Sequence, residues 1–171
     1  EAFKRGVLYT FPPPFRRFVV AAAEEINCAL GSFIRGSLLV SLVVALLTYG
    51  GLLFLRVKFP LVLALFAGVT NLIPYIGPVL GALPAWVVAF FDAPLLSLKV
   101  ILLMIIVQQV ECQLIAPVIL GRSARLHPLV IILALLLGGK LFGFAGLLLA
   151  VPVALVLRIL GTHLLALWRG R

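Results

Sequence analysis

The amino-acid sequence predicts an all-helical integral membrane protein, a polytopic bundle with two hairpins broken by proline and glycine. Hydrophobic residues make up 64% of the 171 residues and charged residues only 11%, whereas a soluble domain carries about 25% charged residues. The mean hydropathy is +1.30, and short basic segments separate the long apolar stretches. A surface so poor in polar side chains has to face lipid, so membrane lipid is the first expected partner.

The N-terminal part is predicted to contain a tail, an amphipathic helix and a membrane-spanning helix. Residues 1–14 are assigned to a linker or tail because consecutive prolines lack the amide donors that a helix needs at its end. Over residues 15–35, apolar side chains recur every three or four positions, which is typical of an amphipathic helix. Residues 36–55 carry no charge and are long enough to cross a bilayer, which takes about 20 residues. They begin a predicted transmembrane transporter domain over residues 36–158.

Two longer apolar stretches carry helix-breaking residues near their middle. Residues 60–91 would measure about 48 Å as one helix, whereas the hydrocarbon core is roughly 30 Å thick. Pro74, Gly77 and Pro78 interrupt this stretch, which predicts a re-entrant hairpin. A second crossing follows over residues 95–120 and is interrupted late by Pro117. Residues 128–157 predict a second hairpin, interrupted by Gly138, Gly139, Gly143 and Gly146. A C-terminal tail is predicted over residues 159–171.

The two predicted hairpins resemble each other in sequence. A shift of 68 positions aligns Pro60 with Pro128 and Pro84 with Pro152 without a gap, which predicts an inverted repeat. Two re-entrant hairpins would leave ten basic residues on one side of the membrane and three on the other. If every stretch crossed, the 14 basic residues would divide evenly. The positive-inside rule therefore favours the hairpins, with both chain ends in the cytoplasm.

Polar residues inside the apolar stretches are the candidate functional residues. A polar group in a membrane segment costs several kcal/mol unless it is paired or faces water. Glu111 is the only acidic residue in the middle of a predicted span, Gln108 shares its helix face, and Lys140 is its candidate partner. Two alternatives are that Asn71 only caps a helix and that Glu111 and Lys140 form a structural ion pair. The predicted path of a solute or ion comprises Asn71, Pro74, Tyr75, Gly77, Pro78, Gln108, Glu111 and Lys140.

Other chemistry finds little support in the sequence. Signatures of enzymes and of nucleotide binding, such as HExxH, GxSxG and the P-loop, are absent from the sequence, so catalysis is not expected. Cys28 and Cys112 lack the spacing of metal ligands and are predicted to be packing residues. The basic residues form no continuous stripe, which argues against nucleic acid as a partner. We expect neither a cofactor nor a metal.

Four short motifs resemble the autoinducer-2 exporter family. They are IPYIGP, the QQxE segment ending at Glu111, LHPL, and GGxLFGxxG. The resemblance implies a multi-pass protein of the bacterial inner membrane that forms a homo-oligomer. It also implies a secondary transporter that exports a small polar solute, such as the signal autoinducer-2, with coupling to protons or sodium. The alternatives are a Na⁺(Li⁺)/H⁺ antiporter, with a monovalent cation as the partner, and a membrane scaffold that transports nothing.

Overall fold

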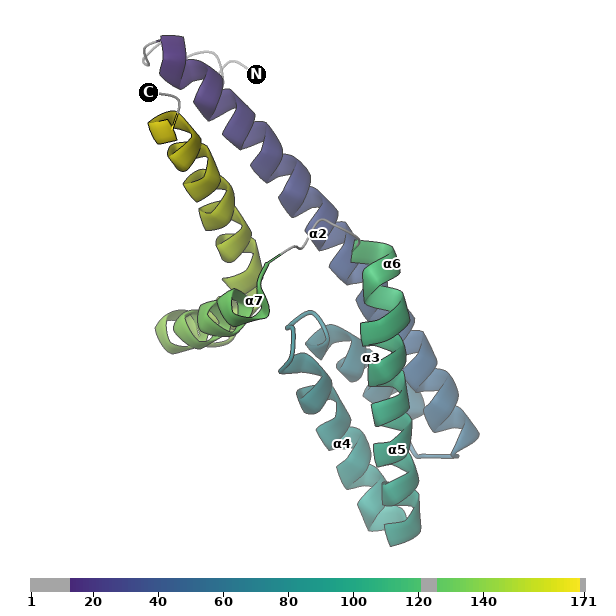
Figure 1. Ribbon diagram of the computed structural model, residues 1–171. Helices are drawn as coiled ribbons and strands as arrows, with labels where there is room; N and C mark the ends of the chain where they lie inside the picture. The colour runs from purple at the N-terminus through teal and green to yellow at the C-terminus, as the bar shows by residue number, and fades with distance from the viewer. Residues whose placement is uncertain (1–12, 121–125, 170–171) are drawn as a thin grey trace. The chain divides into compact units, whose positions relative to one another are not determined.

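The computed structural model describes residues 13–120 and 126–169, and every regular element in these ranges is a helix (Figure 1). The fold class predicted from the sequence is confirmed to this extent. The chain divides into two compact units, residues 33–123 and the residues on either side of them. The helices are α2 (Pro13–Phe54), α3 (Pro60–Thr70), α4 (Gly77–Asp92), α5 (Pro94–Val110), η1 (Glu111–Ile115), α6 (Ala116–Leu120) and α7 (Pro128–Arg169).

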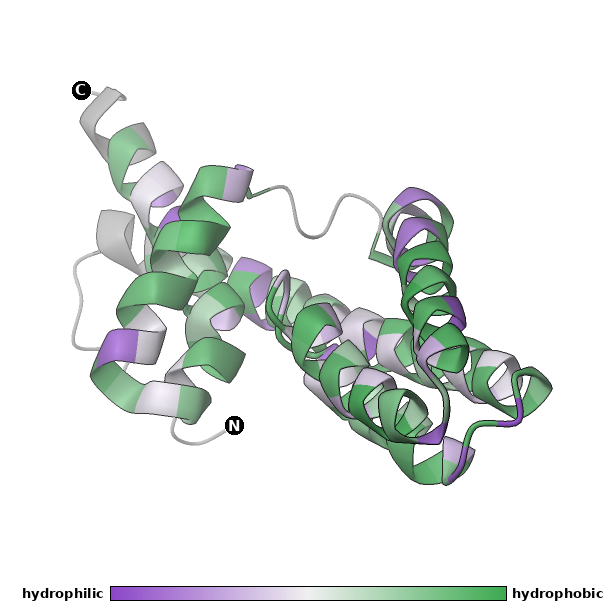
Figure 2. Cartoon of the chain, turned by 90° about the horizontal axis from the view of Figure 1, so that it is seen from below, coloured by the Kyte–Doolittle hydropathy of each residue, from purple (hydrophilic) through white to green (hydrophobic). Residues whose placement is uncertain are grey.

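Hydrophobic residues predominate along the helices (Figure 2), and many of their large apolar side chains are exposed. Among the described residues, three helical stretches are long and apolar enough to cross a membrane: Val19–Phe54, Pro94–Leu120 and Pro128–Leu165. Exposed leucine and isoleucine side chains occur in all three of them. In water such a surface would be strongly unfavourable, whereas in lipid it needs no partner. This surface and the three stretches are those of a membrane protein.

Helix α2 is longer than the sequence analysis predicted. A boundary was expected at residue 35, and Pro13 and Pro14 were expected to lie outside the helix, but α2 continues through 42 residues. Prolines are tolerated in the first turn, where the missing amide would have no intrahelical acceptor. Gly36 does not end the helix, and Leu120 and Ile119 pack where its side chain would be. The rest of the predicted linker lies outside the described residues.

Helices α3 and α4 have the shape of the first predicted hairpin. Six residues, 71–76, connect them, and the base of the hairpin is closed by an ion pair between Lys58 and Asp92. Close packing is possible because Gly81 of α4 lies against Ala67 and Thr70 of α3. Buried side chains of α2, α3, α4 and α5 form one hydrophobic core together with Val57: Leu52, Leu63, Ala85, Ala89 and Val100. The shape of the hairpin does not show whether it enters and leaves the membrane on one side, so re-entry stays a prediction.

The Lys58–Asp92 pair gives a direct test of the hairpin in the membrane. In a protein with Cys28 and Cys112 replaced by serine, Lys58→Cys and Asp92→Cys place one cysteine at each end of the hairpin. We expect both cysteines to react with a membrane-impermeant maleimide added to the same side of sealed vesicles. Labelling of the two positions from opposite sides would exclude re-entry. Loss of the ion pair itself should cost less than about 1 kcal/mol because the lysine is exposed.

Helix α5 continues into α6 through the π-helical segment η1. Within η1 the hydrogen bonds widen, and the amide of Ala116 donates to the carbonyl oxygen of Glu111, five residues earlier. Pro117 explains this segment, because proline has no amide to donate to the carbonyl of Gln113 and its ring would collide with that carbonyl. The late interruption predicted in the second crossing is thus a widened turn, and it begins at Glu111.

Helix α7 contains the second predicted interruption. Gly143 has φ 59° and ψ −136°, so it joins two helical arms instead of continuing one helix. The backbones of Gly138 and Gly146 touch, since a Cβ atom on either would overlap the carbonyl of the other. The second arm extends to Arg169, so the predicted tail over residues 159–171 is largely helical. His163 on this arm lies 3.4 Å from the Glu25 carboxylate of α2, within the same unit.

Candidate functional site

One hydrogen bond joins the tip of the α3–α4 hairpin to the π-helical segment. The Asn71 side-chain amide Nδ2 donates to Oε1 of Glu111 over 2.8 Å, and the pair is partly buried. The other carboxylate oxygen, Oε2 of Glu111, is buried and has no hydrogen-bond partner among the described residues. The sequence analysis selected both residues as candidates, and the structure places them in contact. A buried carboxylate oxygen without a donor is costly, so this atom is a candidate binding position for a proton or a cation.

The local sequence explains how Asn71 reaches Glu111. Asn71 follows the last residue of α3, and its own backbone amide donates to the Ala67 carbonyl, so its side chain is free to act outside the helix. The Thr70 hydroxyl donates to backbone carbonyls of its own helix and does not compete for the site. At the start of α4, Gly77 packs directly on the Thr70 carbonyl, a position that no larger residue could occupy. The hairpin tip thereby holds Asn71 in place.

Helix α2 contributes two buried hydroxyls that the sequence analysis missed. Ser41 and Thr48 are buried, and their hydroxyl oxygens have no hydrogen-bond partner among the described residues. The Ser41 carbonyl lies where a side chain on Gly68 would be, one turn before Asn71 along α3. Serine and threonine in apolar helices often bond to their own backbone, so their presence in the sequence was not a signal. Only the packing of α2 on α3 shows that these hydroxyls are buried and unpaired.

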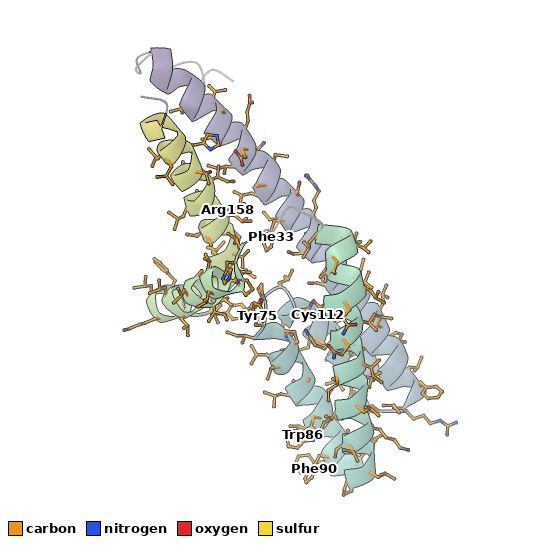
Figure 3. All side chains as sticks on the ribbon, in the orientation of Figure 1. Phe33, Tyr75, Trp86, Phe90, Cys112 and Arg158 are labelled. Atoms are coloured by element: carbon orange, nitrogen blue, oxygen red, sulfur yellow. The ribbon has the colours of Figure 1, made fainter. Side chains whose placement is uncertain are left out.

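Polar side chains continue along α5 and η1. Gln108 donates to the sulfur of Cys112 over 3.2 Å, one turn along the helix. Cys28 and Cys112 are both exposed on this chain, so the prediction that they are packing residues was wrong. The absence of metal-ligand spacing had suggested a packing role, but it does not tell a buried position from one on a surface that faces lipid. Cys112 lies near the level of Tyr75 in Figure 3.

A cavity of about 530 Å³ lies between α4 and α5. Three of the candidates predicted from the sequence line this cavity: Tyr75, Pro78 and Gln108. Trp86 and Met104 also line it and were missed, because aromatic and apolar residues in apolar helices do not differ in sequence from ordinary core or lipid-facing residues. Tyr75 and Trp86 mark opposite ends of the α4 side of this cavity (Figure 3).

The remaining candidates have different positions. Pro74 shapes the hairpin tip, where its carbonyl accepts a hydrogen bond from the Ile76 amide over 2.8 Å. Tyr75 has a positive φ of 64°, which is uncommon outside glycine. Lys140 is an exposed residue of α7 and belongs to the other unit. The expected pairing of Lys140 with Glu111 therefore stays a prediction.

Comparison with known proteins identifies the family. The family description "AI-2E family transporter" matches residues 1–166. The chain is 39% identical to YrrI of Bacillus subtilis, named provisionally as a transport protein, over 96% of this chain and 47% of YrrI. It is 34% identical to PerM of Escherichia coli K12, named provisionally as a permease, over 79% of this chain and 39% of PerM. The chain spans about half the length, or less, of these curated relatives. With a match over nearly its whole length, the chain belongs to the AI-2E transporter family.

Proposed function

We propose that this chain forms a membrane part of a secondary transporter that exports a small polar solute, such as autoinducer-2, with coupling to protons or sodium. The contact between Asn71 and Glu111 is the observation that carries this proposal. It places a carboxylate and an amide at the junction of a broken hairpin and a widened helix turn. Secondary transporters bind substrates and coupling ions at such helix breaks, where backbone and side-chain groups are free to coordinate them.

The coupling role rests on the two oxygens of Glu111. Oε1 accepts the hydrogen bond from Asn71, whereas Oε2 is buried and has no partner among the described residues. A proton or a monovalent cation bound at Oε2 would satisfy this atom, and the two ions would compete for it. The same observation favours a second candidate function, a Na⁺(Li⁺)/H⁺ antiporter, in which no organic solute is carried.

Re-entrant hairpins would place these groups within the bilayer. Helix α3 has 11 residues and α4 has 16, which correspond to about 17 Å and 24 Å, both shorter than a hydrocarbon core of roughly 30 Å. The ion pair of Lys58 with Asp92 joins the two ends of this hairpin. These features support a hairpin that enters and leaves on one side of the membrane.

The internal repeat has support from backbone geometry. The shift of 68 positions that aligns the prolines also aligns Tyr75 with Gly143. These two residues have φ angles of 64° and 59° and lie at the two breaks. The same shift aligns Thr70 with Gly138. The Thr70 carbonyl packs against Gly77 of the following arm, and the Gly138 carbonyl packs against Gly146 of the following arm. A residue with positive φ at the same register of two segments is expected of a repeat, and in transporters such repeats are often inverted.

The location and assembly of the protein follow from the family as proposals. We place it in the bacterial inner membrane as a multi-pass protein with both ends of this chain in the cytoplasm, assembled as a homo-oligomer. The basic residues near the chain ends support this orientation.

Flux measurements on the purified protein in sealed proteoliposomes test the proposal. We expect export of autoinducer-2 driven by an imposed proton or sodium gradient, saturating with solute concentration. Exchange of sodium for protons without solute flux would instead identify the antiporter. Absence of both fluxes would support the scaffold and contradict the proposal. Currents far above the turnover of a transporter would indicate a channel.

A further inference from the structure

The cavity between α4 and α5 has a polar end and an apolar body. Tyr75 of the hairpin tip, together with Gln108 and Gln109 of α5, supplies most of its hydrogen-bonding groups, and all three lie toward the tip, whereas the indole N–H of Trp86 is a single donor further along α4. Toward the other end, its walls are formed by side chains such as Ala82, Trp86 and Ile101. Helices α4 and α5 are antiparallel neighbours joined through Ala93, so the N-terminal end of α4, at the hairpin tip, lies beside the C-terminal end of α5 (Figure 1). The polar groups are therefore concentrated at one end.

The lining also indicates the charge of a ligand. No Asp, Glu, Lys or Arg is among the described residues that line this cavity. An ionised group placed there would lose its hydration without gaining a counter-charge, which is strongly unfavourable in apolar surroundings. Amide and phenol groups, by contrast, can donate to and accept from an uncharged polar group. The polar end therefore fits an uncharged head that forms hydrogen bonds.

The size of the cavity limits the apolar part of the ligand. On α5 the lining runs from Val100 to Gln109, a rise of about 14 Å. A volume of about 530 Å³ is typical of sites for small molecules, which are mostly apolar with a few polar groups that orient the ligand. An alkyl chain of about ten carbons would extend over this length, whereas a two-chain phospholipid would exceed the volume.

We propose that the cavity between α4 and α5 binds a neutral single-chain amphiphile. Its polar head lies at Tyr75, Gln108 and Gln109, and its alkyl chain lies along Ala82 and Trp86. Neither Asn71 nor Glu111 is among the residues that line the cavity, and the proposal requires binding only. It can therefore be tested apart from the proposed transport function.

Trp86 provides an internal reporter for this site. This chain has two tryptophans, so within it Trp168→Phe leaves Trp86, in the cavity wall, as the single tryptophan fluorophore. Any tryptophan outside this chain is replaced by phenylalanine as well. The protein in lipid nanodiscs is titrated with monoacylglycerols brominated on the alkyl chain, over a series of chain lengths. Quenching should saturate and be strongest near about ten carbons. Simple partitioning into the bilayer would instead rise by roughly fourfold with each added methylene over the whole series.

Matched variants distinguish the cavity from the surrounding lipid. Ala82→Phe fills the cavity and should weaken binding at least tenfold, whereas Leu102→Phe, on an exposed part of α5 outside the cavity, should leave it unchanged. Gln109→Leu should weaken binding of the monoacylglycerol about tenfold without affecting a brominated alkane of equal length. A fatty acid that is ionised at the assay pH should bind more weakly than the monoacylglycerol. Quenching that does not saturate, or that Ala82→Phe does not change, would overturn the proposal. Absence of quenching would show that another protein segment fills the cavity, which also overturns it.

Discussion

Replacement of Gly77 by alanine is expected to open the tip of the α3–α4 hairpin. A Cβ atom at this position would overlap the Thr70 carbonyl and come close to Asn71. Both are backbone contacts, so no side-chain rotation can relieve them, and the two helices have to separate. Overpacking of this kind costs about 3 kcal/mol or more when the backbone must move. Asn71 would then be displaced from Glu111, so the variant should lose stability and gradient-driven flux together.

Unfolding in a titration with denaturing detergent measures the effect of Gly77→Ala on stability. Gly50→Ala is the matched control, because Gly50 also lies in a helix but a Cβ atom added there would meet no neighbouring atom within 4 Å. There the exchange should be neutral or stabilising by up to about 1 kcal/mol, since alanine favours helix more than glycine does. Equal stability of the two variants would show that the close contact of Gly77 with Thr70 does not form in the membrane.

Replacement of Glu111 by glutamine is expected to abolish coupling while leaving the fold intact. Glutamine has nearly the same shape, and its carbonyl oxygen can still accept the hydrogen bond from Asn71. It can neither release a proton nor attract a cation, so the flux driven by a proton or sodium gradient should fall to the level of empty vesicles. Folding, measured by detergent denaturation, should change by less than about 1 kcal/mol, because a neutral amide is easier to bury than a carboxylate.

Two further variants make the Glu111 result specific. Glu24→Gln removes an exposed carboxylate of α2 and should leave coupling unchanged. Glu111→Asp keeps the charge but shortens the side chain by one methylene, so the hydrogen bond of 2.8 Å to Asn71 should be lost and coupling should fall only in part. Gradient-driven flux that persists in Glu111→Gln would remove Glu111 from the coupling mechanism. Equal loss in Glu24→Gln would show a general effect of charge.

Apolar length and the positions of proline and glycine were sufficient to predict the helices and both breaks. Pro74, Gly77 and Pro78 lie at the first connection, and Gly143 lies at the second. The change at residue 35 from an amphipathic to a uniformly apolar pattern lies inside α2, since such a change alters the surroundings of a helix without ending it. The exposure of Cys28 and Cys112 was not predicted, because the absence of metal-ligand spacing does not tell a buried side chain from one that faces lipid.

The sequence by itself determined that this is a helical membrane protein with scarce polar groups at broken helices, because hydropathy and helix-breaking residues act locally along the chain. Only the tertiary structure decided which of these groups meet. Asn71 and Glu111 are 40 positions apart, and their contact depends on the close packing of Gly77 against Thr70 and on the widened turn before Pro117. The cavity between α4 and α5 was equally hidden, since its walls consist of ordinary apolar residues whose concave arrangement arises only when two helices pack side by side.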